Sequence, residues 1–594
     1  MNQTDNSSPN GDFLSTAARL FWLILIIATL YLCYFHNLGA IGLVGPDEPR
    51  YAWIAREMHE SGDWVTPRLY GKPWFEKPPL LYWGTALSFK LFGVSDAAAR
   101  LPSAFAALLA TLAMAWLAWR VYGAWTARWL LLLLPTTVGM IGFSHAVATD
   151  MPFAAALAIA MVLAAGILGL VSPAGFTIYT PISSFYTDTS AWRPLSLFFF
   201  GFFLGLATLA KGPAAIVLSG GGVLLWAAIT RRWRDAFRCL HPVAIASFCL
   251  TALPWYILCS CRNPDFFRIF IIEHNFKRYL TPEFQHIQPF WYYVPVLLIA
   301  FAPWTLALVW SALSGALRAW PQRRPSDATL LALCWSIFCL VFFSISQSKL
   351  PGYILPAIPP TGLLLSRAFV RLVPQEGWTF RLLLLAGAIP SILVALVLWS
   401  LHFGVERFTA AAAWGAGWIL VLFGLANLLL ATRNSAKQLP SPLSSLSVVP
   451  ILAIVLFFNH LAPLFLRYDP SGKTIAQELR AAQIPPEQTF VTAMPRGQQF
   501  SLSFYLRNEI QSWDSDQPKE GYLLQSSKAC RFVAKPPWTC STDPLELQTS
   551  GWFVYKVQRE DSVSNRADRG TLRGKNLGGG LNRDGLDTRD RQPR

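Results

Sequence analysis

The chain has 594 residues, of which 54% are hydrophobic and only 14% charged, and it carries a formal net charge of +16. With a mean hydropathy of +0.39, this composition excludes an ordinary soluble enzyme, in which about 25% of residues are charged. It predicts a polytopic membrane protein. Much of the positive charge lies in short loops and in residues 559–594, which favours solvated loop charges over nucleic-acid binding.

Apolar stretches long enough to cross a bilayer recur along the chain, since a core of roughly 30 Å takes about 20 residues. The first stretch has no small-residue cleavage site and is expected to be a retained span rather than a signal peptide. The runs between polar breaks predict about 13 transmembrane helices. Their expected limits are 19–37, 98–119, 125–144, 151–170, 195–210, 213–230, 241–260, 290–313, 327–346, 351–372, 379–402, 409–431 and 446–465.

The short loops predict the orientation, because arginine and lysine are retained on the cytoplasmic side. Every second loop is arginine-rich, as at 231–238, and the short loops between carry at most one basic residue. The N-terminus is therefore expected to be cytoplasmic. Asp47, Asp150 and the segment after Arg467 are expected on the outer face.

Two loops on the outer face, 38–97 and 261–289, are too long to be simple turns. Within the first, 51–58 and 80–92 have the apolar spacing of amphipathic helices and are expected at the membrane surface. Six prolines punctuate this loop, which indicates a shaped segment.

The ionisable residues of the first loop form a pattern typical of phosphate and sugar chemistry. Arg50 offers a planar fork of donors and Lys77 a compact charge, and both suit an anionic head group. Asp47, Glu48 and Glu76 offer acceptors for sugar hydroxyls, a proton or a cation. The alternative for the two cations is interfacial snorkelling.

Asp150 stands at the head of the predicted span 151–170. An aspartate followed by Met-Pro is a good helix N-cap, which is the alternative to a functional role. The predicted topology puts Asp150 on the same face as Asp47. The two carboxylates are therefore expected to share one site.

The region 467–557 predicts a small α/β domain on the outer face, with a helix at 473–482 and strands at 488–493, 500–506 and 552–557. Cys530 and Cys540 lie in this region, which the topology places in an oxidising compartment. They are expected to form a disulfide or to stay as two thiols. The charged tail 558–594 is expected to be disordered.

Six motifs in order along the chain resemble the lipid A aminoarabinose transferase family. That family belongs to the wider group of GT-C-type integral-membrane glycosyltransferases that includes protein O-mannosyltransferases. The resemblance runs from Leu20 to Pro356, and more weakly to Val557. The motifs are Asp-Glu-Pro-Arg-Tyr-Ala at 47–52, Ser-Gly-Asp-Trp at 61–64, Phe-Glu-Lys-Pro-Pro at 75–79, Lys-Gly at 211–212, Phe-Trp-Tyr-Tyr-Val-Pro at 290–295 and Lys-Leu-Pro-Gly-Tyr-Ile-Leu at 349–355.

The resemblance implies a monomeric enzyme of the bacterial inner membrane with a periplasmic C-terminal domain. It would transfer a sugar, an aminoarabinose-like pentose or a hexose, from undecaprenyl phosphate to lipid A or another envelope acceptor. Departures at Pro79, at Gly352 and in the insertion 172–190 leave the sugar and the acceptor open.

The resemblance also assigns roles to individual residues. Its matched positions are Asp47 and Asp150 as catalytic carboxylates; Arg50, Lys77, Tyr353 and Lys349 beside the carrier phosphate; Glu48, Tyr51, Tyr82 and Lys211 as substrate contacts; and Glu76 with His274 as ligands of a divalent metal ion. For His274 the residues alone favour a hydrogen-bonded imidazole, so metal dependence stays open.

The residues themselves, without the family, also indicate a sugar transfer from a polyprenyl phosphate. A departing polyprenyl phosphate needs fixed cations near it, such as Arg50 and Lys77. For a hydroxyl acceptor, Asp47 would be the general base of an inverting reaction, a role that contributes roughly 10²–10⁴ in rate. A phosphate acceptor needs no base, and the carboxylates would then orient the sugar. The alternatives are a protein O-glycosyltransferase and a lipid-linked glycan flippase, although charges confined to one face favour an enzyme.

Overall fold

The computed structural model describes residues 9–171, 192–281, 287–319, 325–372, 470–513, 520–526, 538–541, 544–547 and 550–559. The predicted spans 379–402, 409–431 and 446–465, the insertion 172–190 and the tail beyond 559 lie outside these ranges. The chain divides into two compact units, Met1–Glu487 with Met494–Ile510, and Gln488–Ala493 with Gln511–Arg594.

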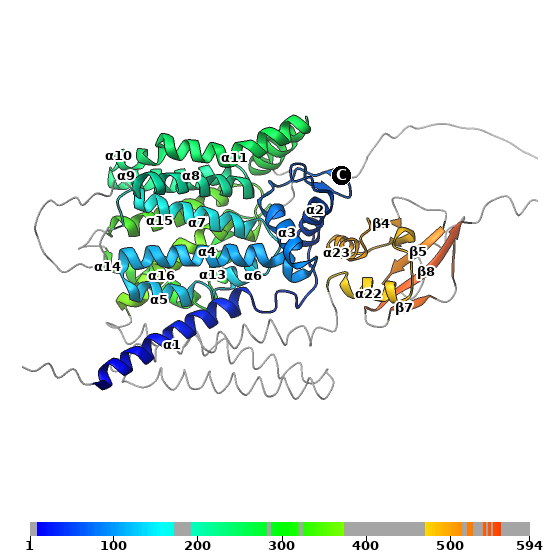
Figure 1. The fold of residues 1–594 in the computed structure, drawn as a ribbon, viewed down its shortest axis with the longest axis horizontal. Helices are drawn as coiled ribbons and strands as arrows, with labels where there is room; N and C mark the ends of the chain where they lie inside the picture. The colour runs from blue at the N-terminus through cyan, green and yellow to red at the C-terminus, as the bar shows by residue number, and fades with distance from the viewer. Residues whose placement is uncertain are drawn as a thin grey trace, which may run out of the picture. The chain divides into compact units, whose positions relative to one another are not determined.

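The first unit is helical, and each of the first ten predicted spans corresponds to a helix or a pair of helices (Figure 1). Among the described residues, six helices are long and apolar enough to cross a membrane, or up to eight if each bent pair is one span. These helices bear out the polytopic class, while the total of about 13 stays a prediction. The helices are α1 (Pro9–Tyr34), α4 (Asp96–Tyr122), α5 (Ala124–Leu133), α6 (Val138–Ser144), α7 (Asp150–Ile167), α8 (Trp192–Lys211), α9 (Ala214–Thr230), α11 (Pro242–Arg262), α13 (Tyr293–Ala300), α14 (Thr305–Ala319), α15 (Asp327–Ile345) and α16 (Ile358–Leu372).

Two predicted spans, 125–144 and 290–313, are broken rather than continuous. The axes of α5 and α6 differ by 62°, and those of α13 and α14 by 116°. A proline stands in each break, Pro135 and Pro303, where the missing N–H and the ring oppose a continuing helix. The side-chain oxygen of Thr137 then accepts a hydrogen bond from the Met140 amide and caps α6.

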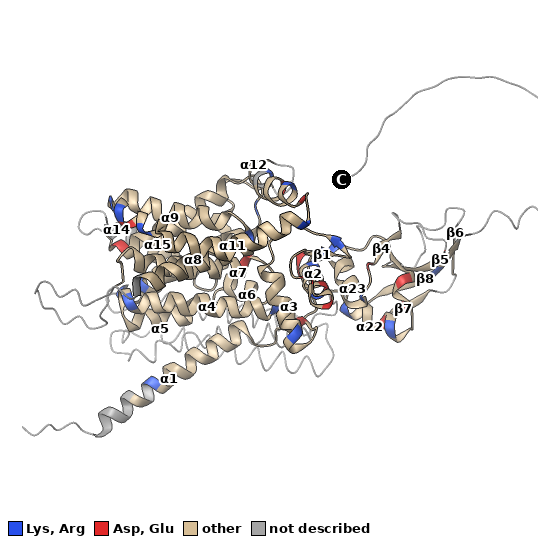
Figure 2. Ribbon diagram, turned by 45° about the horizontal axis from the view of Figure 1, so that its top comes forward, with Lys and Arg blue, Asp and Glu red and all other residues tan. Residues whose placement is uncertain are grey.

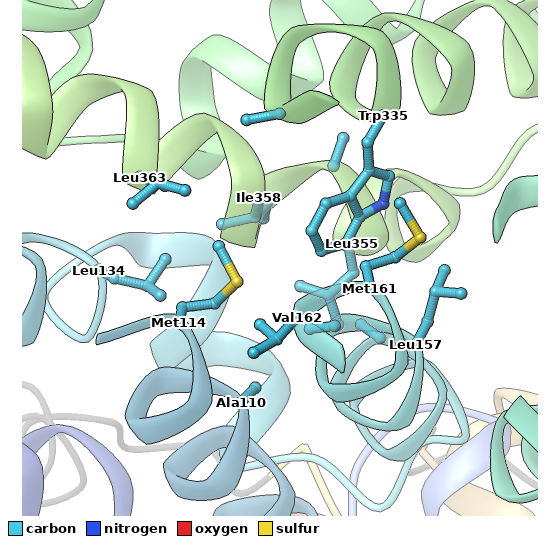
Figure 3. Packing of buried hydrophobic residues seen from close by; sticks show 14 of the residues in the cluster. Ala110, Met114, Leu134, Leu157, Met161, Val162, Trp335, Leu355, Ile358 and Leu363 are labelled. Atoms are coloured by element: carbon cyan, nitrogen blue, oxygen red, sulfur yellow. The ribbon is translucent and has the colours of Figure 1, made fainter. Parts of the chain in front are cut away.

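Helix α7 lies at the centre of the bundle and packs against α4 and α8, while α15 packs against α9 and α16 (Figure 1). Most of α7 is buried all round, as expected of a helix without a polar face. Its many alanines allow close helix approach. Side chains of Met114 from α4, Met161 from α7, Trp335 from α15 and Leu363 from α16 meet in this core (Figure 3).

Shorter elements precede or link these helices. Helix α2 includes the predicted segment 51–58 but begins at Asp47, and α3 matches 80–92. Figure 2 shows the bundle almost free of charge, with charged segments near α2 and again near α14. The shorter elements are α2 (Asp47–Ser61), β1 (Arg68–Leu69), β2 (Lys72–Pro73), α3 (Leu80–Phe92), α10 (Trp233–Phe237), η1 (Arg238–Leu240), the π-helical η2 (Phe267–Lys277), α12 (Arg278–Leu280), the 3-10 helix η4 (Pro351–Ala357), α22 (Lys473–Ala481), η9 (Pro486–Gln488) and α23 (Arg496–Leu506).

The strand predicted at 500–506 is wrong, because these residues form the end of α23. Phenylalanine, leucine and serine alternate here with the period of a strand. The two serines are nevertheless buried, since Ser501 donates to the Leu43 carbonyl and Ser503 to the Gln499 carbonyl. One long-range bond and one bond within the helix therefore satisfy the two serines and override the alternating pattern.

The second unit contains a mixed sheet with the strand order β4-β3-β5-β8-β6, and β7 also pairs with β8. Strand β3 runs parallel to β4 and β5, and β8 runs antiparallel to β5. The predicted helix 473–482 and strands 488–493 and 552–557 are confirmed as α22, β3 and β8, although α22 and α23 belong to the first unit. Cys540 is disulfide-bonded, and its predicted partner, Cys530, lies outside the described residues. The strands are β3 (Thr489–Val491), β4 (Gln511–Ser512), β5 (Glu520–Gln525), β6 (Trp538–Cys540), β7 (Leu545–Leu547) and β8 (Trp552–Arg559).

Candidate functional site

Arg50, in the first turn of α2, is the centre of a charged group at the start of that helix. Its guanidinium pairs with Asp47 one turn earlier and with Glu76, whose Oε2 is 3.2 Å from Nη1. Its Nε donates to the Pro46 carbonyl at 2.7 Å. The other oxygen of Glu76 lies 3.5 Å from Lys77 Nζ. One carboxylate therefore holds both cations that the sequence assigned to a phosphate.

Aromatic rings surround the Arg50 guanidinium. Its central carbon is 5.4 Å from the Phe500 ring, 5.6 Å from Trp74 and 6.0 Å from Tyr51. Burial opposes the charge, but Glu76, Tyr51 and Asp47 together outweigh it, so the pKa of Arg50 is raised. The guanidinium is a fixed and permanent cation with 9% of its side chain exposed.

Two buried hydrogen-bond donors near this group have no partner among the described residues, the hydroxyl of Tyr82 and the indole Nε1 of Trp74. Tyr82 is fully buried, with its ring 5.8 Å from that of Tyr51. Burial, assisted by Glu76, raises the pKa of Tyr82 well above its usual value, so the hydroxyl keeps its proton. A buried unpaired donor is costly unless something binds it. Both donors suit an acceptor-rich ligand.

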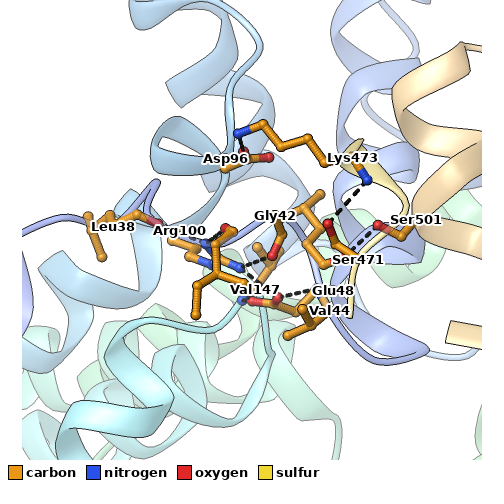
Figure 4. A network of polar contacts seen from close by, with 12 residues as sticks. Leu38, Gly42, Val44, Glu48, Asp96, Arg100, Val147, Ser471, Lys473 and Ser501 are labelled. Carbon is orange, nitrogen blue, oxygen red and sulfur yellow. Dashed lines mark hydrogen bonds and ion pairs between the residues drawn. The ribbon is translucent and has the colours of Figure 1, made fainter. Parts of the chain in front are cut away.

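Glu48, predicted as a substrate contact, has its oxygens occupied within the protein (Figure 4). Oε2 accepts from the Val44 amide at 2.9 Å and from Arg100 Nη2 at 2.9 Å. Oε1 accepts from Arg100 Nε at 3.2 Å and from the Val147 amide at 2.8 Å. With 7% of its surface exposed, Glu48 has the geometry of a scaffold residue rather than of a substrate ligand.

Arg100 fixes the segment that leads into α2. Besides Glu48, it donates to the carbonyls of Leu38 and Ile41, each at 2.8 Å, and of Gly42 at 2.9 Å. Every one of its donor nitrogens is therefore bonded. Figure 4 shows the arginine between the 38–44 segment and Glu48. A buried arginine with these partners holds an irregular backbone in one conformation.

The hydrogen bond from the Val147 amide to Glu48 connects the two segments that carry the predicted catalytic carboxylates. Asp47 precedes Glu48 in the chain, and Asp150 follows Val147 by three residues. Val147 also packs with Tyr51 and Tyr82 in one apolar cluster. The structure thus anchors both carboxylate-bearing segments to the same buried glutamate.

Asp150, the first residue of α7, forms an ion pair with Lys211 at the end of α8, with 2.5 Å between Oδ1 and Nζ. Lys211 Nζ also lies 4.3 Å from the ring centroid of Tyr353. Near Lys211, Leu209 packs with Phe75, the neighbour of Glu76, in one cluster. Asp150, Lys211 and Tyr353 therefore form a second polar group, although the sequence had assigned the three residues to different roles.

Gly352 lies directly against the Asp150 carboxylate. A Cβ added there would be 2.8 Å from Asp150 Oδ1 and 2.9 Å from a ring carbon of Phe143, closer than real contacts allow. This glycine was singled out in the sequence only as a departure from the family pattern. Because glycine has no side chain, there is room for the Asp150 carboxylate.

Gly352→Ala is expected to displace Asp150 and to lower the free energy of unfolding by about 1–3 kcal/mol, the usual cost of overpacking. The apparent melting temperature of the purified protein measures this. Gly166→Ala, in α7 with nothing within 4 Å of the added Cβ, is the matched control and is expected to keep the wild-type value. Equal melting temperatures for both variants would contradict the close packing.

Helices α22 and α23 also hold Asp96, the first residue of α4, and Leu43, in the segment that leads into α2. Lys473 Nζ lies 2.7 Å from Asp96 Oδ2, and the Tyr505 hydroxyl donates to Asp96 Oδ1 at 2.6 Å while accepting from the Leu43 amide at 2.8 Å. Burial and the Asp96 carboxylate raise the pKa of Tyr505, so its hydroxyl stays a donor. Arg56 of α2 adds a bond to the Phe504 carbonyl at 3.2 Å.

The remaining predicted residues, Lys349, Glu76 and His274, do not form one site. Lys349 is buried, and its Nζ donates to the Ser346 carbonyl. In the parts of the chain that the structure describes, no three His, Cys, Asp or Glu side chains gather as a metal site would require. Glu76 already faces two cations. The described residues therefore do not fit the predicted metal site.

Sequence reasoning missed Arg100, Asp96 and the aromatic contribution of Phe500. One signal was present for Arg100, which falls inside the predicted span 98–119, where a charge is a marker of function or of a buried partner. No local pattern connects Phe500 with Arg50, 450 positions apart.

Comparison with known proteins matches residues 19–270 to the family "Dolichyl-phosphate-mannose-protein mannosyltransferase". An undecaprenyl phosphate-alpha-4-amino-4-deoxy-L-arabinose arabinosyl transferase from Enterobacter sp. (strain 638) is 30% identical over 436 residues, which are 70% of this chain and 72% of that protein. The chain belongs to this arabinosyl transferase family. The Edwardsiella ictaluri relative of the same name is 32% identical over 60% of this chain, and the match spans 62% of that relative's length.

The fold of the family is also known. The crystal structure of ArnT from Cupriavidus metallidurans bound to undecaprenyl phosphate is 26% identical to this chain, with a TM-score of 0.70. The match covers 90% of this chain and 98% of that one. The protein is thus a multi-pass membrane protein with the architecture of this arabinosyl transferase family.

Proposed function

We propose that the protein is an inverting glycosyltransferase that moves a sugar from undecaprenyl phosphate to an acceptor on the outer face of the bacterial inner membrane. The observation that carries this proposal is the joining of two charged groups, Asp47 with Arg50 and Asp150 with Lys211, through Glu48 and Val147. The names of the family relatives support the donor and the reaction class. One chain supplies both groups, so we propose a monomer.

In this proposal Arg50 and Lys77 stabilise the carrier phosphate as it leaves. The bond between the anomeric carbon and the phosphate oxygen breaks, and the electron pair departs with the polyprenyl phosphate. Cations already held in place by Glu76 need no reorganisation when that charge develops. Tyr82 and Trp74 offer further donors to the phosphate or sugar oxygens. We assign Glu76 to orienting the two cations.

The carboxylates act on the sugar side. The Asp47 side chain is 51% exposed although it pairs with Arg50, so it remains accessible to a substrate. With a hydroxyl acceptor, its oxygen would take the proton as the acceptor oxygen bonds to the anomeric carbon. With a phosphate acceptor no proton moves, and the carboxylates orient the sugar.

The narrower proposal is transfer of an aminoarabinose-like sugar to lipid A. The relatives are named for 4-amino-4-deoxy-L-arabinose, whose amino group is a cation when protonated. Asp47 and Asp150 are acidic partners suited to it, with Lys211 and Tyr353 alongside Asp150. The proposed orientation keeps the N-terminus cytoplasmic and the C-terminal sheet periplasmic.

Asp47→Asn is expected to reduce transfer of labelled sugar by about 10²–10⁴-fold if the acceptor is a hydroxyl, because the general base is lost. Purified protein with an undecaprenyl-phosphate donor measures the rate, and a separate donor-binding assay shows whether affinity changed. Asp265→Asn, an exposed outer-loop carboxylate paired with Arg268, is the control and is expected to keep wild-type activity. Wild-type transfer by Asp47→Asn would remove Asp47 from the mechanism.

A further inference from the structure

A cavity of about 610 Å³ lies at the arginine-rich end of the helical bundle, away from the proposed active site. It is formed where α4, α7 and α16 end and where α15 begins. Helix α7 starts at Asp150 and ends at Ile167, and Gly169 and Leu170, just after its end, line this cavity. At 1.5 Å per residue, that helix separates the two places by roughly 27 Å. The predicted orientation makes this the cytoplasmic face.

Arg367 is the most informative residue of the cavity. It is 9% exposed, and its Nη1 lies 3.3 Å from the Tyr122 hydroxyl and 3.3 Å from Ser326 Oγ. Its central carbon is 4.3 Å from the Tyr122 ring centroid. Its Nε is buried without a hydrogen-bond partner among the described residues. The guanidinium thus has only neutral hydrogen-bond partners among the described residues and an unused donor, which is costly for a buried cation.

The cavity also carries a positive excess. Arg371 follows Arg367 by four residues, so the two side chains occupy the same face of α16. The third lining arginine, Arg232, is already neutralised, because it pairs with Asp327 at 2.7 Å and with Asp235 at 2.6 Å. Within the described ranges, Asp327 is the only acidic lining residue. Arg367 and Arg371 therefore face the cavity without an acidic partner there.

We propose that this cavity binds a phosphate-bearing anion, a phosphomonoester or phosphodiester. Guanidinium groups match phosphate oxygens with paired donors, and Ser326 and Thr126 add hydroxyls to the lining. The volume is within the usual range for a small-molecule site of about 300–1,000 Å³. A phospholipid head group and a soluble phosphate share this chemistry.

The test uses the purified full chain and two probes, inorganic phosphate and dihexanoyl phosphatidylglycerol below its micelle concentration. Binding is followed by isothermal titration calorimetry and by the apparent melting temperature, at constant ionic strength in chloride so that screening does not vary. We expect saturable binding of at least one probe. Binding of the lipid alone identifies a head-group site, binding of phosphate alone a soluble-anion site, and binding of both a site for the shared group.

Arg371→Gln is expected to weaken the observed binding about tenfold or more, because one charge-assisted contact is lost. Arg371 is exposed, so this variant should fold, and Arg367→Gln provides a second variant within the same cavity. Arg234→Gln, on α10 and outside the cavity lining, is the matched control and should bind as the wild type does. The proposal is overturned if neither probe binds, or if Arg371→Gln binds with wild-type affinity.

Discussion

Lys77→Ala is expected to lower the single-turnover rate of sugar transfer from undecaprenyl phosphate by about 10²–10³-fold, the usual effect of removing one group that stabilises developing charge. The Lys77 ammonium lies 3.5 Å from Glu76, which also pairs with Arg50. Both partially buried cations are therefore fixed before the phosphate departs. Losing one leaves the other in place, so a residual rate is expected.

The control for Lys77 comes from the same loop. Lys72 lies in β2 and is exposed, so Lys72→Ala changes the net charge by the same amount without touching the Arg50 group. It should keep the wild-type rate. If Lys77→Ala and Lys72→Ala transfer sugar equally fast, Lys77 does not stabilise the leaving phosphate.

Arg100→Gln is expected to give the largest loss of stability, about 3–5 kcal/mol, because it leaves the buried Glu48 carboxylate without its cation. It also removes bonds to the carbonyls of Leu38, Ile41 and Gly42, which shape the entry to α2. Denaturation of the purified protein measures the change. Transfer activity should fall with it, since Asp47 follows this segment.

Two further variants separate the Glu48 pair from general charge effects. Glu48→Gln combined with Arg100→Gln should be less destabilising than the sum of the single changes. Each single variant leaves one buried charge unpaired, whereas the double variant leaves none. Arg68→Gln removes an exposed pair with Asp63 at 3.8 Å and should change stability by less than about 1 kcal/mol. Wild-type stability for Arg100→Gln would contradict the scaffold role.

The transmembrane helices could be predicted because an apolar run long enough to cross a bilayer is recognisable in the sequence. Two of these helices are broken at Pro135 and Pro303, and a prediction from hydropathy alone does not take these prolines into account. The strand predicted at 500–506 failed for a different reason. Ser501 occupies a buried position because its hydroxyl bonds to the Leu43 carbonyl, 458 positions away, and no local sequence pattern contains that information.

The same limit applies to the site: the sequence indicates which side chains carry suitable chemical groups, but it does not indicate what those groups contact. The sequence motifs pointed to Asp47, Arg50 and Lys77, and the position at the head of a predicted span pointed to Asp150, since charges beside apolar spans are few. The motifs could not tell a ligand from a support. Glu48 carries the same functional group as its neighbour Asp47, and only the contacts of Arg100 and Val147 show that its oxygens are occupied.

The most direct test of the central claim follows the fate of the donor in sealed proteoliposomes. They would contain the purified protein, an undecaprenyl-phosphate sugar labelled in the sugar, and lipid A as the acceptor, with products analysed by mass spectrometry. Our account predicts a new glycosidic bond to the acceptor and release of one undecaprenyl phosphate for each sugar transferred. Movement of intact labelled donor across the bilayer without a new bond would contradict it and would indicate a flippase.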